Sequence, residues 1–331
     1  MLSIPIAIVV IIVSFFLIGK SADVLIKALA NLGKRLGWNE FVIGFIILGL
    51  ATSTPELFVA LNAGWENYPQ LSLGNILGGM IVLFTLLIGL NALLQGVIFT
   101  EKKFSVINVF RFLPRALPFW RPNFFIKDLF LMATIILLPL FLLWDRVLSR
   151  VDGLILIIAY LFFILHAIYD RRMDGWDPPV EVASSRKIIF WFIIGLSGLF
   201  IFSWLIVEQA VFLAETWQVP TLILGLLVLS IGTNLPELTL TIKARKYHSE
   251  VVVGDILGSA MANILVLGLL SLFFPFEIIV WQPLLIVSLS LIVVTLVLII
   301  FLHTKDRLER WEGGVLVGMY LMYLIIELIK L

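Results

Sequence analysis

Long apolar runs alternate with short polar links along almost the whole chain. Because a membrane-spanning helix needs about 20 mainly apolar residues, this pattern predicts an all-α polytopic membrane protein with ten transmembrane helices. The predicted spans are residues 4–30, 38–64, 71–96, 124–144, 151–170, 187–215, 220–243, 250–274, 280–302 and 312–330. The longest links, 97–123 and 171–186, leave little chain for a soluble domain.

Composition agrees with this pattern and excludes several other classes. Hydrophobic residues make up 61% of the chain and charged residues 14%, whereas a soluble domain averages about 25% charged residues. The net charge of +1 gives no basic excess for nucleic acid. Without cysteine, and with only three scattered histidines, the chain has neither a disulfide framework nor a zinc signature. The sequence indicates no cofactor.

The distribution of basic residues predicts the orientation. Lys and Arg concentrate in the links after the odd-numbered spans, and the opposite links with the C-terminal end hold only Arg146, Arg150 and Lys330. By the positive-inside rule both termini lie outside. The first run lacks a basic region and a small-residue cleavage site, so we interpret it as a span rather than a signal peptide. The compact chain fits a prokaryotic plasma membrane.

The link that contains residues 101–123 mixes basic and aromatic side chains. Two interpretations stand. It is either a solvated cytoplasmic linker, or a segment that lies on the anionic inner leaflet.

An internal repeat divides the chain into residues 1–170 and 187–331, with the short cytoplasmic linker 171–186 between them. Residues 26–57 align without a gap to 207–238, and three ordered matches support the alignment. They are Thr52, Pro55, Glu56 and Leu57 with Thr233, Pro236, Glu237 and Leu238; Gly74-Asn75-Ile76-Leu77-Gly78 with Gly254-Asp255-Ile256-Leu257-Gly258; and Asp152-Gly153 with Glu312-Gly313. Because five spans per half is an odd number, the second half is predicted to be inverted, as in secondary transporters.

Glu56 and Glu237 are predicted to lie inside the membrane, in the second and seventh spans. A charge at the centre of the bilayer costs about 2.5–3.5 kcal/mol on the insertion scale, so such residues usually face a cavity and bind an ion or a proton. The alternative is a protonated carboxyl that only hydrogen-bonds between helices. A matched pair in two repeats favours the ion-binding interpretation.

The residues around each glutamate supply further oxygens. The preceding proline frees the backbone carbonyl four residues back, which belongs to Ala51 or Gly232. Thr52 and Thr233 lie four residues before the glutamates, on the same helix face. Hard cations such as Ca²⁺ take 6–8 oxygen ligands, carboxylates among them, so the pattern predicts a divalent-cation site.

Spans three and eight differ from each other. Ser259 and Asn263 share a helix face in span eight, and the matching positions in span three are Gly79 and Leu83. We interpret Ser259 and Asn263 as cation ligands rather than packing residues. The glycines of both spans are interpreted as packing positions, because small residues let helices approach closely.

These motifs resemble the two alpha repeats of the sodium/calcium exchangers, within the cation/Ca²⁺ exchanger superfamily, and the resemblance covers nearly the whole chain. It implies ten helices and alternating access, in which the first and sixth helices slide past a fixed core. It also implies a Ca²⁺ between the two glutamates and the threonine carbonyls, here Glu56, Glu237, Thr52 and Thr233. The implied sodium sites use the same glutamates, the serine after each threonine, and a Ser-x-x-x-Asn/Asp pair on spans three and eight.

The chain departs from this family pattern at the flanking positions. Ser53 follows the first threonine as in the family, but Asn234 follows the second, and Gly79 and Leu83 offer no side-chain oxygen. The central divalent site is thus complete, whereas the flanking monovalent sites are asymmetric and depleted. The family default leads us to expect exchange of Ca²⁺, or a similar divalent cation, for Na⁺. Coupling to H⁺ and a non-transporting relative remain alternatives. An enzyme is disfavoured, because no nucleophile lies beside a base and no phosphate-binding loop is present.

Overall fold

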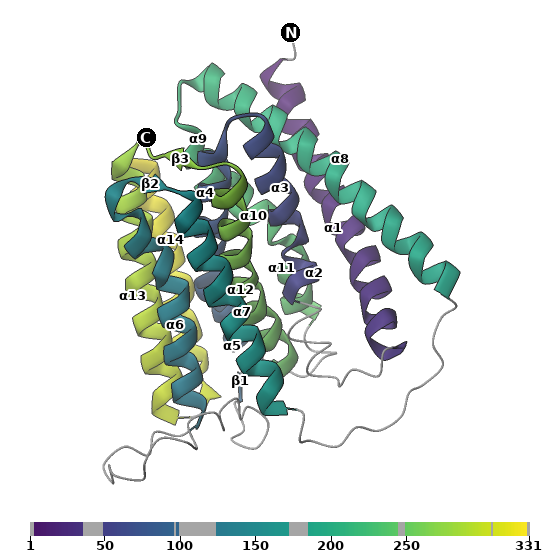
Figure 1. The fold of residues 1–331 in the computed structure, drawn as a ribbon. Helices are drawn as coiled ribbons and strands as arrows, with labels where there is room; N and C mark the ends of the chain where they lie inside the picture. The colour runs from purple at the N-terminus through teal and green to yellow at the C-terminus, as the bar shows by residue number, and fades with distance from the viewer. Residues whose placement is uncertain are drawn as a thin grey trace.

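The computed structural model is a helical bundle in which the first helix begins, and the last helix ends, at the same end (Figure 1). It describes residues 3–35, 49–95, 97–98, 124–171, 185–243, 249–305 and 307–329. The α-helices are α1 Ile4–Arg35, α2 Gly49–Thr52, α3 Thr54–Trp65, α4 Pro69–Ile81, α5 Ile88–Gln95, α6 Phe124–Leu142, α7 Arg150–Arg171, α8 Ser185–Trp217, α9 Thr221–Leu224, α10 Ser230–Thr233, α11 Leu235–Lys243, α12 Ser249–Phe273, α13 Trp281–Lys305 and α14 Arg310–Ile329. Two π-helical stretches, η2 Val82–Leu87 and η5 Gly225–Leu229, and one 3₁₀ turn, η4 Leu143–Asp145, lie between them.

Helices occupy the described part of every predicted span, which bears out a mainly helical membrane protein. Within those ranges, six helical segments are long and apolar enough to cross a membrane by length and composition. They are Ile4–Leu25, Pro69–Leu94, Arg186–Trp217, Asp255–Phe273, Trp281–Leu302 and Arg310–Ile329. Ten crossings and the inverted relation of the halves stay predictions, and the basic aromatic segment 101–123 lies outside the described residues.

Four two-residue strands, which the sequence did not predict, make the all-α description incomplete. They are β1 Val97–Ile98, β2 Val147–Leu148, β3 Phe276–Glu277 and β4 Arg307–Leu308. β1 pairs antiparallel with β4, and β2 with β3. Each pair therefore joins segments from the two halves of the chain near the helix ends.

The two Pro-Glu-Leu segments interrupt their helices at matched places. Ser53 leaves helical geometry between α2 and α3 with φ −82° and ψ 5°, and Asn234 does so between α10 and α11 with φ −84° and ψ 12°. The interruption follows from proline, which lacks an N–H donor and is tolerated in the first turn of a helix. The broken segments run in opposite directions, α2 to α3 toward the end where α1 begins and α9 to α11 away from it (Figure 1).

The matched pairs Asp152-Gly153 and Glu312-Gly313 lie at the starts of α7 and α14, and the same local structure explains both. The Asp152 carboxylate accepts a hydrogen bond from the backbone N–H of Ser149 (2.8 Å), and Glu312 does the same for Glu309 (2.7 Å). Each is the third-position acid of a capping box, which satisfies a backbone donor at a helix start. The following glycine lets a second helix approach closely: a Cβ on Gly153 would lie 2.7 Å from the carbonyl oxygen of Gly268.

Helices α4 and η5 also meet backbone to backbone. A Cβ added to Gly74 would collide with the carbonyl oxygen of Leu222, and one added to Gly225 with that of Leu71. The packing interpretation of Gly74 is therefore confirmed. This contact holds the span-three helix rigidly against the segment that leads to Glu237.

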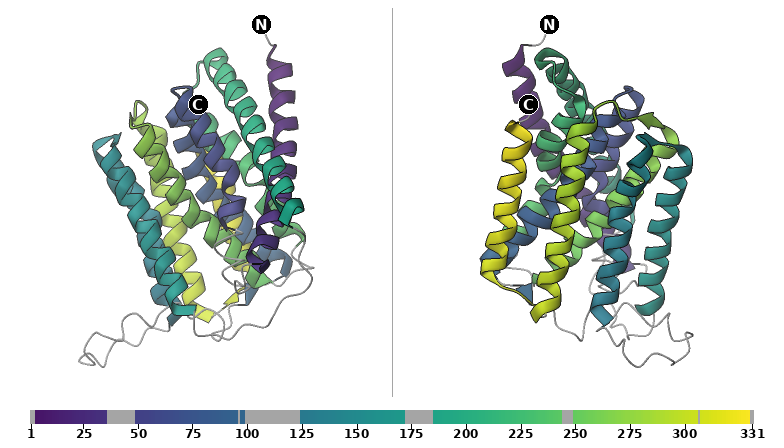
Figure 2. Two further views of the ribbon diagram at one scale, coloured as in Figure 1. Left: turned by 45° about the vertical axis from the view of Figure 1, so that its right-hand side comes forward. Right: turned by 90° about the vertical axis from the view of Figure 1, so that its left-hand side faces the viewer.

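The hydrophobic side chains form two separate clusters. The larger is built mainly on α4, α5, α7, α12, α13 and α14, and the smaller joins α1 and α8 with residues of α3, α9 and η5. In Figure 2, α1 and α8 lie side by side at one edge of the bundle. The α1/α8 pair thus packs on α3, α9 and η5 through a hydrophobic cluster that is distinct from the larger one.

Candidate cation site

The two motif glutamates lie in the first turn after each helix break, deep inside the protein. Glu56 and Glu237 are each 1% exposed. Both carboxylate oxygens of Glu56, and Oε2 of Glu237, have no hydrogen-bond partner. A buried charge without a partner is strongly unfavourable, so a bound cation or a proton would stabilise these oxygens.

Each motif threonine contacts the opposite half of the chain. Thr52 Oγ1 donates to Asp255 Oδ1 (3.2 Å), and Thr233 Oγ1 donates to Asn75 Oδ1 (3.1 Å). Asp255 and Asn75 are the variable residues of the two Gly-x-Ile-Leu-Gly matches, so the contacts repeat with the motifs. Our prediction of site residues missed both. The signal was present, because a polar residue occupies the same place in each of the two repeats.

On the second-repeat side, α12 brings Ser259 and Asn263 to the site. Ser259 Oγ lies 2.7 Å from Thr52 Oγ1 and donates to Glu237 Oε1 at 3.4 Å. Neither the oxygen nor the nitrogen of the Asn263 amide has a hydrogen-bond partner, although the residue is buried. An amide with spare donor and acceptor capacity is costly inside a membrane protein, which favours a ligand over a packing role.

The residues that follow the threonines take different positions. Ser53 Oγ donates to the backbone oxygen of Ser259 (3.3 Å), whereas the Asn234 amide nitrogen donates to the backbone oxygen of Ser230 (2.7 Å). The Asn234 Oδ1 has no hydrogen-bond partner. The predicted residues of the two halves therefore meet across the helix breaks.

Gly79 lies directly beside these amides. A Cβ at Gly79 would lie 3.0 Å from Asn234 Nδ2 and 3.8 Å from Asn263 Nδ2. The absence of a side chain at Gly79 thus provides the room that the longer Asn234 side chain uses. Leu83, one turn further on in η2, is fully buried and adds no oxygen.

The oxygen atoms that could bind a cation at this site belong to several chemical groups. Among the described residues, no three His, Asp or Glu side chains are grouped closely enough to hold a metal ion. A cation at this place would draw on hydroxyl, amide and backbone oxygens as well as on the two glutamates. Such all-oxygen sets suit hard cations.

Helix α1 covers the second helix break. The Phe15 ring occupies the space where a side chain at Gly232 would stand. The break at Asn234 is therefore closed from one side by an aromatic residue of the α1/α8 pair. Any movement of α1 along the bundle would change this cover.

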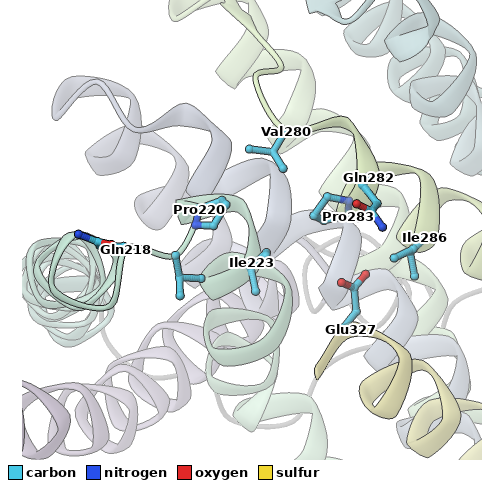
Figure 3. A pocket seen from close by; sticks show the side chains of 9 residues that line it. Gln218, Pro220, Ile223, Val280, Gln282, Pro283, Ile286 and Glu327 are labelled. Atoms are coloured by element: carbon cyan, nitrogen blue, oxygen red, sulfur yellow. The ribbon is translucent and has the colours of Figure 1, made fainter. Parts of the chain in front are cut away.

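A cavity elsewhere in the structure is separate from the candidate cation site. It lies between the start of α9, the start of α13 and the end of α14, and Figure 3 shows Pro220, Ile223, Pro283 and the Glu327 carboxylate around it. None of the motif residues lines it.

The family model described as sodium/calcium exchanger protein matches residues 6–169 and 187–329. The chain belongs to the sodium/calcium exchanger family. As a member it is an integral membrane protein of a transporter family rather than an enzyme family, and the resemblance drawn from the motifs is confirmed.

Individual relatives agree with this membership. The chain is 25% identical to the sodium/calcium exchanger MaX1 of Methanosarcina acetivorans, over 93% of this chain and 94% of that protein. It is 30% identical to the inner membrane protein YrbG of Escherichia coli, over 81% of this chain and 80% of that protein. Structures of the sodium-calcium exchanger NCX_Mj share the fold, with a TM-score of 0.66 at 20% identity, over 98% of this chain and 99% of that chain.

Proposed function

We propose that this protein exchanges Ca²⁺, or a similar divalent cation, for Na⁺ by alternating access. The observation that carries the proposal is the set of buried carboxylate oxygens on Glu56 and Glu237 that have no hydrogen-bond partner. Two carboxylates neutralise one divalent ion, and the Thr52 and Thr233 backbone carbonyls are the further ligands that the family pattern implies. The transported cations are substrates, and the proposal needs no resident cofactor.

Sodium would use oxygens that flank the divalent site. On the second-repeat side these are Ser259 and Asn263, and beside the helix breaks they are Ser53 and Asn234. Asn234 Oδ1 and Asn263 Oδ1 are both buried without a partner, so each has capacity for a cation. This capacity favours coupling to sodium, because coupling to protons would need only the two glutamates and not the two asparagine oxygens.

Alternating access would come from the α1/α8 pair. The apolar contact of α1 and α8 with α3, α9 and η5 would be the sliding surface, along which Phe15 would move past Gly232. Shear between packed helices is a common form of such transitions. We place the protein in a prokaryotic plasma membrane with both termini outside, which follows from the distribution of Lys and Arg.

Flux of ⁴⁵Ca²⁺ into proteoliposomes tests the function directly. With purified protein, an outward Na⁺ gradient should drive Ca²⁺ uptake, and a pH gradient of equal size at zero Na⁺ should drive little. Uptake driven only by the pH gradient would favour proton coupling. Folded protein that gives no flux under either gradient would contradict exchange altogether and favour a non-transporting relative.

A further inference from the structure

The cavity between the start of α9, the start of α13 and the end of α14 combines one buried charge with mainly apolar walls. Its volume is about 160 Å³. Glu327 is in the wall although its side chain is only 1% exposed, and Figure 3 shows its carboxylate facing Pro283 and Ile286. The other lining residues are Gln218, Val219, Pro220, Ile223, Val280 and Gln282.

The repeat comparison separates Glu327 from the paired motifs. Alignment of Asp152-Gly153 with Glu312-Gly313 places Ala167 opposite Glu327, so the acid belongs to one half only. Glu327 is also the only charged residue between Glu312 and the end of α14. The acid at the cavity is therefore a local feature of the second half and not a copy of the duplicated cation site.

Glu327 makes the cavity favourable for a positive group. Electrostatic attraction is stronger in low-dielectric surroundings than in water, so a carboxylate in a buried wall attracts a cation more strongly than an exposed one does. Gln282, exposed at the start of α13, can add an amide oxygen as a further hydrogen-bond acceptor. Both acceptors come from the side of the cavity that α13 and α14 form.

A hard metal ion fits this cavity poorly. Ca²⁺ takes several oxygen ligands and Mg²⁺ needs an octahedral set, whereas Pro220, Ile223, Pro283 and Ile286 offer no side-chain oxygen. Within the described ranges, no three His, Asp or Glu side chains are grouped to hold a metal ion. A ligand that fills the cavity therefore needs an apolar part as well as a positive charge.

We propose that this cavity binds a primary ammonium group that carries a small apolar substituent. The ammonium has three N–H donors, which the Glu327 carboxylate and the Gln282 amide oxygen accept, and the apolar walls pack against the substituent. The size fits, because an apolar cavity of about 150 Å³ holds a molecule as large as benzene. The ammonium comes either from a free amine or from the headgroup of an aminophospholipid. Binding here needs no transport, so the site is independent of the proposed exchange.

Isothermal titration calorimetry on the full-length protein in detergent tests the free amine. We expect isobutylammonium, which is slightly smaller than benzene, to bind with a Kd of about 1 mM, an affinity within the reach of such small ligands. Isobutanol lacks the charge and NH₄⁺ lacks the apolar part, so both should bind about tenfold more weakly or worse. The same loss is expected for isobutylammonium with Glu327→Gln. Glu277→Gln, which removes an exposed acid at the same end of the molecule, should leave binding unchanged.

A second titration identifies the source of the ammonium. Delipidated protein is titrated with short-chain phosphatidylethanolamine and with short-chain phosphatidylcholine, whose quaternary nitrogen has no N–H donor. Binding of the ethanolamine lipid alone, in competition with isobutylammonium, supports a lipid headgroup, and binding of isobutylammonium alone supports a free amine. Isobutanol that binds wild-type protein as well as isobutylammonium does overturns the site even if Glu327→Gln does not fold. Folded wild type that binds neither ammonium compound also overturns it.

Discussion

The first-repeat and second-repeat sides of the cation site have the same backbone plan and different side chains. Beside the helix breaks, the first repeat places a short Ser53 and the second a longer Asn234. In the facing helices the order is reversed, with Gly79 on the first-repeat side and Ser259 on the second. Because a Cβ at Gly79 would lie 3.0 Å from Asn234 Nδ2, the large residue of one repeat stands where the other repeat has none.

The departures at Asn234 and Gly79 therefore fit together sterically. The Asn234 amide nitrogen faces the place where a Cβ at position 79 would stand, and the Asn234 amide oxygen has no hydrogen-bond partner. The comparison teaches that the size of the residue after the second threonine and the size of the residue facing it depend on each other.

The glutamates are the part of the site in which the two sides agree, and removing either should have the largest effect. We expect Glu56→Gln and Glu237→Gln each to lower Na⁺-driven ⁴⁵Ca²⁺ uptake at least about a hundredfold, because either change leaves the ion with an uncompensated charge in a buried site. Uptake into proteoliposomes with matched protein content measures this.

An acidic residue outside the bundle is the matched control. Glu66, exposed at the end of α3, should tolerate Glu66→Gln with unchanged uptake. If one motif variant keeps most of its activity, the two sides do not share one divalent ion, and the symmetric part of the comparison is wrong.

Much of this arrangement could be predicted from the sequence, because it follows from local chemistry. The membrane pattern, the helix breaks before Pro55 and Pro236, and the pairing of Glu56 with Glu237 all rest on short-range rules. The Asp255 contact with Thr52 joins residues 203 positions apart, and no local pattern states which partner a buried hydroxyl will find. The same holds for Asn234 beside Gly79, since that fit depends on how α4 packs against the second helix break.

Substitutions at Gly79 and Asn234 should have an effect of intermediate size on uptake, and they test whether the two residues depend on each other. Gly79→Ser alone should lower uptake about tenfold, because its Cβ crowds the Asn234 amide and overpacking of this kind costs about 1–3 kcal/mol. Asn234→Ser alone removes the amide oxygen and leaves a gap. The double variant places the serines of the family pattern at both positions, with Leu83 unchanged, and should recover most of the wild-type uptake.

The measurement is a double-mutant cycle in uptake rate and in thermal stability. Residues in contact show coupling energies of about 0.5–3 kcal/mol, so the double variant should be clearly better than the product of the singles. Additive losses would mean that Asn234 and Gly79 act independently and that their contact is incidental.

We expect the smallest effect on uptake at Asn263, whose aligned residue in the first repeat is the apolar Leu83. Asn263→Leu makes span eight resemble Leu83 of span three. Because neither polar atom of the Asn263 amide has a partner, its replacement should raise the free energy of unfolding by about 1 kcal/mol while slowing uptake a few-fold. Asn62 is the matched control, since its buried amide donates to Ser203 Oγ at 2.8 Å, and Asn62→Leu should destabilise. Thermal unfolding in detergent, read beside uptake at several Na⁺ concentrations, separates the two roles. A ligand role predicts a more stable protein with weaker Na⁺ dependence, whereas a packing role predicts that Asn263→Leu loses stability as Asn62→Leu does.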